Sequence, residues 1–433
     1  MRIAQIAPLA ESVPPKLYGG TERVVAWLVD ELVSLGHEVT LFASGDSRTR
    51  GDLHPVWPRA LRLSRPVVDP TVACTALLEA IAQRVEEFDV VHSHIDWLHL
   101  PLLSRLGVPF LTTMHGRLDL PGLSNVVRQF SEAHFVSVSD NQRLPLASAN
   151  WSGTVHHGLP ANLFRPSNGR GSYLAFLGRL TAEKGPETAI RIARATGMQL
   201  RIAAKLPRGE RRYFKERLEP QIDGRQISLI GEVNDEAKQP FLAGAAALLF
   251  PIEWPEPFGL VMIEAMACGT PVIAFRSGSV PEVIDEGVTG FVVDNEEQAV
   301  QAVKRLGEID RRRVRERFEE RFTAGRMAAD YLLHYQVVVS GGSAEDRRNR
   351  FLAAEVNADS RHLTPPHVIN KLNETDPAIG PPQAAPEFQV PGNRTRQQKL
   401  IVDRHAAWAR ARPIGSLRAG HRVTEMRYLQ YRG

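Results

Sequence analysis

Short apolar runs alternate with amphipathic segments along most of the chain, and this alternation predicts two α/β domains in succession. Such an order is typical of a parallel sheet with helices on its faces. In the first part, strands are predicted at residues 2–7, 38–43, 88–92, 110–114 and 134–138. A helix is predicted at residues 21–35, because its apolar positions form one stripe and Gly36 suits a left-handed helix end.

The same alternation starts again after a polar, glycine-rich stretch at residues 167–172, whose composition is typical of a linker. Further strands are predicted at residues 173–177, 199–203, 227–230, 247–251 and 271–274, with a helix at residues 186–196. A last helix is predicted at residues 327–336. It is rich in Ala, Leu and Tyr and therefore needs a surface to pack on.

These patterns predict an α/β protein with two Rossmann-like domains and a tail. The predicted parts are an N-terminal domain at 1–166, a second domain at 172–322, a helix returning to the first domain at 323–340, and a basic tail of low order at 341–433. In the tail, prolines interrupt a polar sequence that has too little apolar surface to offset the entropy of ordering. One helix is predicted within it, near residues 396–410.

Charge and cysteine content narrow the class of protein. The net charge is +4, but residues 341–433 hold 15 Lys and Arg against 9 Asp and Glu, so the remaining body is close to neutral and gives no reason to expect nucleic-acid binding. Cys74 and Cys268 stand far apart in no metal-binding or redox spacing, which fits a reducing compartment. With no secretory signal and no apolar run of about 20 residues, we expect a cytoplasmic protein.

The most informative stretch runs from residue 255 to residue 272, Pro-Glu-Pro-Phe-Gly-Leu followed by Val-Met-Ile-Glu-Ala-Met-Ala-Cys-Gly-Thr-Pro-Val. It predicts a loop after a buried strand, then a short helix starting near Phe258. Free backbone N–H groups at the start of that helix form an anion site at the carboxyl end of the sheet. Glu264, two turns into the helix, is placed to accept hydrogen bonds from a ribose diol. Glu256 lies on the loop.

A second motif, Gly178-Arg179 followed by Lys184-Gly185, places two cations on one loop after a predicted strand. In the glycosyltransferases that this motif resembles, cations at this position hold the donor diphosphate, and they would stabilise it as it leaves because it gains negative charge when its bond to the sugar breaks. The chain contains no Asp-x-Asp sequence, the usual ligand set for a metal that bridges a diphosphate. We therefore expect the two cations to replace a metal.

Glu256 and Glu264 with their surroundings resemble the E-x7-E signature of retaining glycosyltransferases of family 4, which have the GT-B fold. The resemblance is close over residues 174–294 and looser over residues 1–165. It implies two Rossmann-like domains facing across a cleft, which close over the substrates. It also implies metal-independent transfer of a hexose from a UDP-sugar or a GDP-sugar with retention of configuration, and no cofactor.

The resemblance assigns roles to further residues. Arg179 and Lys184 would hold the diphosphate, Glu256 would contact the sugar hydroxyls, and His115, which ends a strand, would lie near the transferred sugar. The segment at 231–233 would contact the base. The full set of predicted donor-binding residues is Gly19, Gly20, Gly178, Val233, Phe258, Gly259, Leu260 and Glu264. The sequence at 277–282 resembles Gly-Gly-x-Pro-Glu with a Ser for one Gly, which leaves the role of Glu282 open.

Each motif also has a plainer interpretation. The glutamates and cations would then be surface charges, Gly19 and Gly20 a turn before a helix, and His115 a structural histidine. The histidines His92, His94 and His99 follow a strand at a spacing that favours separate directions over a shared metal. Trp97 and Trp254 are candidates for stacking on a sugar ring or for the core.

Two other functions remain open from the sequence. A GT-B-fold nucleotide-sugar epimerase or isomerase would share the fold but would need its own acid and base. A Rossmann-type NAD-dependent oxidoreductase would need a Gly-x-Gly-x-x-Gly after the first strand, and that fingerprint is missing. The acceptor is open among a sugar, a lipid-linked glycan and a small metabolite. The basic tail allows contact with an anionic membrane.

Overall fold

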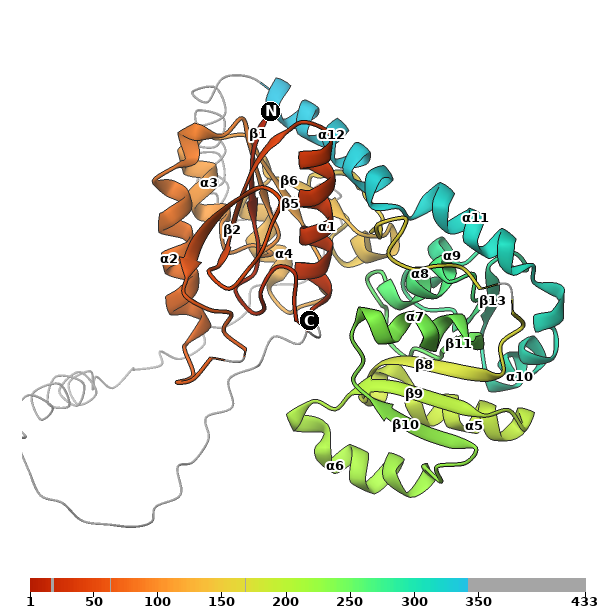
Figure 1. The fold of residues 1–433 in the computed structure, drawn as a ribbon. Coiled ribbons are helices and arrows are strands. Elements are labelled where there is room, and N and C mark those ends of the chain that lie inside the picture. Colours follow the sequence, from red (N-terminus) through yellow and green to blue (C-terminus); the bar gives the residue numbers. More distant parts are fainter. Residues whose placement is uncertain (17–18, 63, 168, 342–433) are drawn as a thin grey trace, which may run out of the picture. The chain divides into compact units, whose positions relative to one another are not determined.

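The computed structural model describes residues 1–16, 19–62, 64–167 and 169–341. Two parallel sheets, each with helices on its faces, follow one another along the described chain (Figure 1). The predicted α/β class with two Rossmann-like domains is confirmed. The predictions for residues 342–433 and for residue 168 of the linker lie outside the described residues.

The first sheet has seven strands in the order β3-β2-β1-β4-β5-β6-β7, all paired in parallel. Its strands are β1 Arg2–Ile6, β2 Glu38–Ser44, β3 Asp52–Trp57, β4 Val90–Ser93, β5 Phe110–Thr113, β6 His134–Ser137 and β7 Trp151–Thr154. The order steps outward from β1 in one direction and from β4 in the other, so the topological switch point, where α/β proteins bind ligands, lies between β1 and β4.

The second sheet has six parallel strands in the order β10-β9-β8-β11-β12-β13. Its strands are β8 Tyr173–Arg179, β9 Leu200–Lys205, β10 Ile227–Gly231, β11 Ala245–Phe250, β12 Val272–Phe275 and β13 Gly290–Val293. The switch point of this sheet lies between β8 and β11. Of the two cationic residues predicted from the sequence, Arg179 ends β8 and Lys184 follows it, and Glu256 follows β11.

The helices cover both faces of the sheets (Figure 1). The helices that carry the argument are α1 Gly20–Ser34, η2 Asn141–Leu146, η3 Ala182–Lys184, α5 Pro186–Thr196, α7 Asp235–Ala243, α8 Leu260–Ala267, α9 Val280–Val283, α11 Arg311–Arg321 and α12 Ala324–Ser340. The others are α2 Pro70–Ala82, η1 Val85–Glu87, α3 Leu100–Leu106, α4 Leu123–Gln129, η4 Arg208–Glu210, α6 Arg211–Tyr213, η5 Phe214–Leu218, η6 Glu219–Gln221, α10 Glu296–Lys304 and η7 Leu306–Glu308.

The sequence pattern located the central strands and one edge strand, β10, and missed the edge strands β3, β7 and β13. β1, β4, β8 and β11 are almost entirely buried, so they appear in the sequence as continuous apolar runs. β3 and β7 lie at the two edges of the first sheet and are largely half-exposed, so their sequences show no such run. β13, the third missed strand, has only four residues and follows a turn.

Helix α12 follows the second sheet in the chain and packs on the first. It contacts α1, β4 and β5, and in Figure 1 it runs beside α1. Tyr331 and Tyr335 are its largest fully buried side chains. The helix predicted at residues 327–336 is the middle of α12, and its Tyr-rich face is the one that packs.

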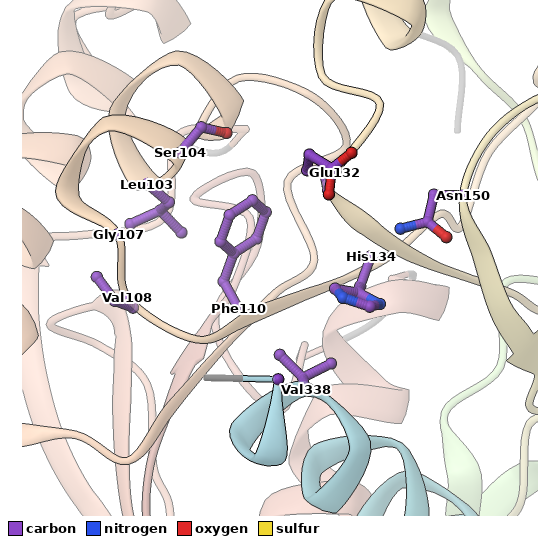
Figure 2. A pocket seen from close by; sticks show the side chains of 11 residues that line it. Leu103, Ser104, Gly107, Val108, Phe110, Glu132, His134, Asn150 and Val338 are labelled. Carbon is purple, nitrogen blue, oxygen red and sulfur yellow. The ribbon is translucent and has the colours of Figure 1, made fainter. Parts of the chain in front are cut away.

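A pocket of about 290 Å³ lies at the amino ends of β5 and β6 and the end of α12 (Figure 2). Phe110 and His134, the first residues of these strands, line it together with Val338. The pocket lies at the amino-terminal edge of the first sheet. The candidate site residues lie at the opposite edge, at the carboxyl ends of the strands.

Among the described residues, no helix combines the length and apolar character needed to cross a bilayer.

Candidate functional site

Lys184 and Glu256 form an ion pair at the carboxyl ends of β8 and β11. Both are largely buried, with side chains 11% and 14% exposed. The Lys184 ammonium also lies 4.9 Å from the ring centre of Trp254, a cation–π contact. The two residues come from separate motifs 72 positions apart, and the parallel neighbouring strands bring them together.

Arg179 ends β8 and supplies a second cation beside this pair. Its guanidinium lies 3.8 Å from Glu183, with the side chain 12% exposed. The buried Nε of Arg179 has no hydrogen-bond partner among the described residues. A buried guanidinium donor without a partner is costly, which favours an anion as its ligand.

The loop that carries Glu256 is fixed by the segment after β12. The backbone carbonyl of Glu256 accepts a hydrogen bond from the N–H of Ser279 at 3.0 Å, and Ser277 Oγ donates to the carbonyl of Trp254 at 2.8 Å. Gly278 between them has a left-handed φ of 56°, and a Cβ there would lie 2.3 Å from the Glu256 carbonyl oxygen. A glycine is therefore required at this position by both conformation and space.

The helix that follows this loop, α8, begins at Leu260, two residues later than the sequence predicted. Gly259 precedes it in the left-handed region with φ 79°, and no side chain caps the helix. Phe258, just before, is buried in the core. The first N–H groups of α8 thus point out of the helix beside the Glu256 loop, which is an arrangement suited to an anion.

Glu264 is the fifth residue of α8, about one turn into the helix, and is 2% exposed. Its Oε1 accepts a hydrogen bond from Lys238 Nζ of α7 at 2.6 Å. Its Oε2 is buried and has no partner among the described residues. One carboxylate oxygen is therefore anchored by a charge, and the other remains as an acceptor for two more hydrogen bonds.

His115 follows β5, and its Nε2 lies 2.8 Å from His94 Nδ1. Burial lowers the pKa of His115 to about 3, so the ring is neutral at physiological pH. The ring stacks on His157, with centres 5.3 Å apart, and His157 in turn packs edge-on against Phe258 at 4.9 Å. Two aromatic contacts therefore connect His115 to the start of α8.

Other predicted residues also lie near the start of α8 or the ion pair. Gly20 opens α1, and a Cβ on it would lie 3.6 Å from Leu260. Gly19 is the residue before that helix, where no side chain forms a cap. Arg117, two residues after His115, lies 5.6 Å from the ring centre of Trp254. Loops after β1, β5, β8 and β11 therefore contribute to one region.

Two of the predicted donor-binding residues, Gly178 and Val233, show no contact with the start of α8 or with the Lys184–Glu256 pair in the described part of the chain. Gly178 is the next-to-last residue of strand β8, and a Cβ there would meet only Phe176 at 4.0 Å. Val233 follows β10 and is half-buried against the core of the second sheet. Their assignment to the donor stays a prediction.

Of the three histidines in and after β4, His99 points away from the other two, but the prediction of separate directions is wrong for His92 and His94. His92 and His94 have ring centres 4.0 Å apart, whereas His99 binds Thr112 Oγ1 at 2.7 Å elsewhere in the core. Among the described residues, no group of three or more His, Cys, Asp or Glu side chains has the arrangement of a metal site. Trp254 lies under Lys184, and the role of Trp97 stays a prediction.

Three contributors were missed by the sequence interpretation. Lys238 anchors Glu264, His157 links His115 to Phe258, and Gln5 binds His94. Lys238 looks like one more polar residue of an amphipathic helix. Of the three, only Gln5 could have been recognised from the sequence, because an amide inside an otherwise apolar central strand needs a buried hydrogen-bond partner.

Two family models match consecutive parts of the chain. The model described as Glycosyltransferase Family 4 matches residues 18–149, and the model described as Glycosyl transferases group 1 matches residues 164–323. The first match falls on the first sheet and the second on the other sheet. The chain is a glycosyltransferase. Neither an isomerase nor an NAD-dependent oxidoreductase is favoured by these matches.

This glycosyltransferase is also similar to curated relatives. It is 28% identical over 354 residues to D-inositol 3-phosphate glycosyltransferase of Acidothermus cellulolyticus, which covers 65% of the chain and 76% of that protein. It is 28% identical over 364 residues to the protein of the same name from Mycobacterium tuberculosis, with 68% and 73% covered.

Solved structures give the fold. Sucrose-phosphate synthase from Thermosynechococcus elongatus superposes with a TM-score of 0.65 at 20% identity, over 79% of this chain and 100% of that one. AviGT4, a glycosyltransferase of avilamycin A biosynthesis, gives 0.60 at 24% identity over 79% and 98%. HepE of Anabaena in complex with UDP-glucose gives 0.58 at 19% identity over 77% and 100%. The glycosyltransferase has the GT-B fold.

Proposed function

We propose that this glycosyltransferase moves a hexose from a nucleotide diphosphate sugar to an acceptor hydroxyl, with retention of configuration and without a metal ion. The observation that carries the proposal is the Lys184–Glu256 ion pair, with Arg179 on the same strand end as Lys184. Two cations that would hold the diphosphate then lie next to a carboxylate that would contact the sugar, at the switch point of the second sheet.

The two cations are proposed to hold the diphosphate. Breaking the bond between the sugar and the diphosphate leaves negative charge on the phosphate oxygens, so Arg179 and Lys184 would bind the transition state more strongly than the ground state. The uncapped start of α8 adds N–H donors for the same anion. Cations and a helix start together would supply the charge that a metal supplies in other enzymes.

Glu264 is proposed to bind the ribose of the nucleotide. Its free Oε2 accepts hydrogen bonds, and its Oε1 is held by Lys238 at 2.6 Å, so the carboxylate has a fixed orientation. A ribose diol offers two hydroxyl donors, which matches the remaining capacity of the carboxylate. Val233 and the segment after β10 would lie near the base.

The transfer itself is proposed to proceed on one face of the sugar. The bond from the anomeric carbon to the diphosphate oxygen breaks, the acceptor oxygen forms a bond to the same face, and a phosphate oxygen takes the acceptor's proton. Glu256 and His115 would orient the sugar through its hydroxyls. The anomeric configuration is then retained without a covalent intermediate on the protein.

The donor is proposed to be a UDP-sugar or a GDP-sugar. The HepE complexes with UDP and UDP-glucose support the first of these. The acceptor is proposed to be a hydroxyl of a sugar, a lipid-linked glycan or a small metabolite, and the relatives named for D-inositol 3-phosphate make a cyclitol phosphate one compound to include in a screen.

The test is a thermal-shift and donor-hydrolysis screen with EDTA present, using UDP-, GDP- and ADP-sugars with NAD(H) as a control. We expect one class of nucleotide sugar to raise the melting temperature. Lys184→Ala and Arg179→Ala should abolish that rise. Arg191→Ala is the matched control, because Arg191 pairs with Glu296 at the surface with its side chain 48% exposed. A rise with NAD(H) alone, or a rise kept in both cation variants, would contradict the proposal.

A further inference from the structure

A chain of buried hydrogen bonds runs from helix α12 through the first sheet to His115. Gln5 Nε2 of β1 donates to the hydroxyl of Tyr335 at 2.9 Å, and Gln5 Oε1 lies 2.8 Å from His94 Nε2. His94 Nδ1 lies 2.8 Å from His115 Nε2. Gln5 and Tyr335 are fully buried and His94 is 2% exposed, so water does not compete for these bonds.

The amide of Gln5 sets the direction of every bond beyond it. Its Oε1 can only accept, so the proton between Gln5 and His94 belongs to His94 Nε2. Burial, with a contribution from the neighbouring histidines, lowers the pKa of His94 well below its usual value, so the ring carries no second proton. His94 Nδ1 is therefore an acceptor, and the proton between the two rings belongs to His115 Nε2.

His115 is left with a lone pair on Nδ1. The ring is neutral, because burial lowers its pKa to about 3, and its single proton is used in the bond to His94. Nδ1 is buried and has no hydrogen-bond partner among the described residues. It can therefore accept a hydrogen bond and cannot donate one, and a hydroxyl is the matching group on a sugar.

Tyr335 holds the amide in this orientation. Its hydroxyl accepts a hydrogen bond from Gln5 Nε2 and lies 2.8 Å from His92 Nδ1, to which it can donate a hydrogen bond. The other ring nitrogen, His92 Nε2, forms a hydrogen bond with Thr113 Oγ1 at 2.7 Å. Tyr335 belongs to the helix that follows the second sheet, so that helix contributes to the protonation pattern at the end of β5.

We propose that Gln5 and Tyr335 are positioning residues that fix His115 in its Nε2–H tautomer, so that Nδ1 accepts a hydrogen bond from a hydroxyl of the transferred sugar. The inference rests on the proposed function for the identity of the hydroxyl. The tautomer itself is a property of the protein alone, and the two parts can be tested separately.

The tautomer is measured by nitrogen NMR of the full chain labelled with ¹⁵N-histidine, with the His115 signals assigned by their loss in His115→Gln. We expect Nε2 to show the shift of a protonated ring nitrogen and Nδ1 that of a bare one. Gln5→Met removes the acceptor and should mix the two tautomers, as should Tyr335→Phe, which removes only the hydroxyl.

Thr112→Val is the matched control. It removes a buried hydrogen bond to His99 on the same sheet and is not connected to His115 by the bonds above. Thr112→Val should lower the free energy of unfolding by an amount similar to that of the Gln5 and Tyr335 variants, and it should leave the His115 signals unchanged. A protonated Nδ1 in the wild type, or a His115 tautomer unaltered in both Gln5→Met and Tyr335→Phe, would overturn the proposal.

Donor hydrolysis tests the link to turnover. Gln5→Met should lower kcat roughly tenfold, with the KM for the donor changed much less. A mixed tautomer with unchanged kcat would overturn the role assigned to Nδ1. Absence of any nucleotide-sugar effect in the wild type would instead overturn the proposed function, and the NMR result would still stand.

Discussion

The carboxylate of Glu282, which belongs to the second sheet's helix α9, accepts a hydrogen bond from the backbone N–H of Asn141 at 2.8 Å. Its other oxygen accepts from the N–H of Asp140, also at 2.8 Å, and lies 3.3 Å from His156 Nε2. Asp140 and Asn141 follow β6 of the first sheet. One side chain thus connects elements on the two sheets, a role that the sequence had left open.

Glu282→Gln should therefore weaken the connection between α9 and η2. The amide of the new Gln has only one acceptor oxygen, and its NH2 group would face the second backbone N–H, from which it cannot accept a hydrogen bond. The free energy of unfolding should therefore fall by about 2 kcal/mol. Glu308→Gln is the control, because that carboxylate is exposed and pairs with Arg305 at the surface. Chemical denaturation at pH 7 measures both, and equal losses would show that the Glu282 contacts contribute little.

The Glu282 contribution should also depend on pH. Burial raises the pKa of Glu282, but the hydrogen bonds from His156 and the backbone N–H groups outweigh burial, so its pKa lies below its usual value. A lowered pKa in the folded state gives stability that is present above about pH 4.3 and is lost as the pH falls through the folded value. The difference in unfolding free energy between wild type and Glu282→Gln should shrink in acid. A difference that grows below pH 4 would contradict this.

Much of the proposed donor site could be predicted from the sequence, because its residues lie in short local motifs. Glu256 and Glu264 are eight positions apart on one loop and helix, and Arg179 and Lys184 lie at and just after the end of one strand. Parallel strands place all carboxyl ends at one edge, so recognising the strands was sufficient to bring the motifs together. The fold followed from the buried central strands for the same reason.

The supporting residues could not be predicted, because their partners are distant in sequence. Tyr335 is 330 positions from Gln5, and Glu282 is 141 positions from Asn141. Neither pair leaves a periodic pattern or a local spacing. The start of α8 was also misplaced by two residues, since Gly259 adopts a left-handed φ that a helical pattern does not reveal.

Gly278→Ala should displace the loop that carries Glu256. Besides the left-handed φ of 56°, an added Cβ would lie 2.3 Å from the Glu256 carbonyl oxygen and 2.4 Å from its nitrogen. The backbone must move to relieve this contact, so donor hydrolysis should fall by at least tenfold and stability by more than about 1 kcal/mol.

Gly287→Ala is the matched control for this variant. Gly287 has a similar φ of 72°, but an added Cβ would meet nothing within 4 Å. It should cost about 1 kcal/mol from backbone strain and leave kcat unchanged. Equal kinetic effects of the two substitutions would show that the Glu256 loop does not depend on Gly278.

Glu264→Gln and Lys238→Met should affect nucleotide binding in different ways. Glu264→Gln keeps an oxygen acceptor but removes the charge that binds Lys238, so affinity for the nucleotide should fall about tenfold. Lys238→Met leaves the Glu264 carboxylate buried without its cation, so stability should fall by about 3 kcal/mol or more. Calorimetric titration and denaturation measure these effects. Unaltered nucleotide affinity in Glu264→Gln would remove the ribose assignment.

The buried histidines should make the protein sensitive to mild acid. Burial lowers the pKa of His99 to about 3, whereas an unfolded histidine has a pKa near 6.5. Below pH 6.5 the unfolded chain therefore binds a proton that the folded chain does not, and stability falls with pH by about 2 kcal/mol for this histidine by pH 5. Urea unfolding at pH 7.5 and pH 5 should show the loss, and His99→Gln should reduce it by that amount. Thr112→Val keeps the buried ring and should keep the full pH dependence, so an equally small dependence in both variants would show that protonation of His99 is not its cause.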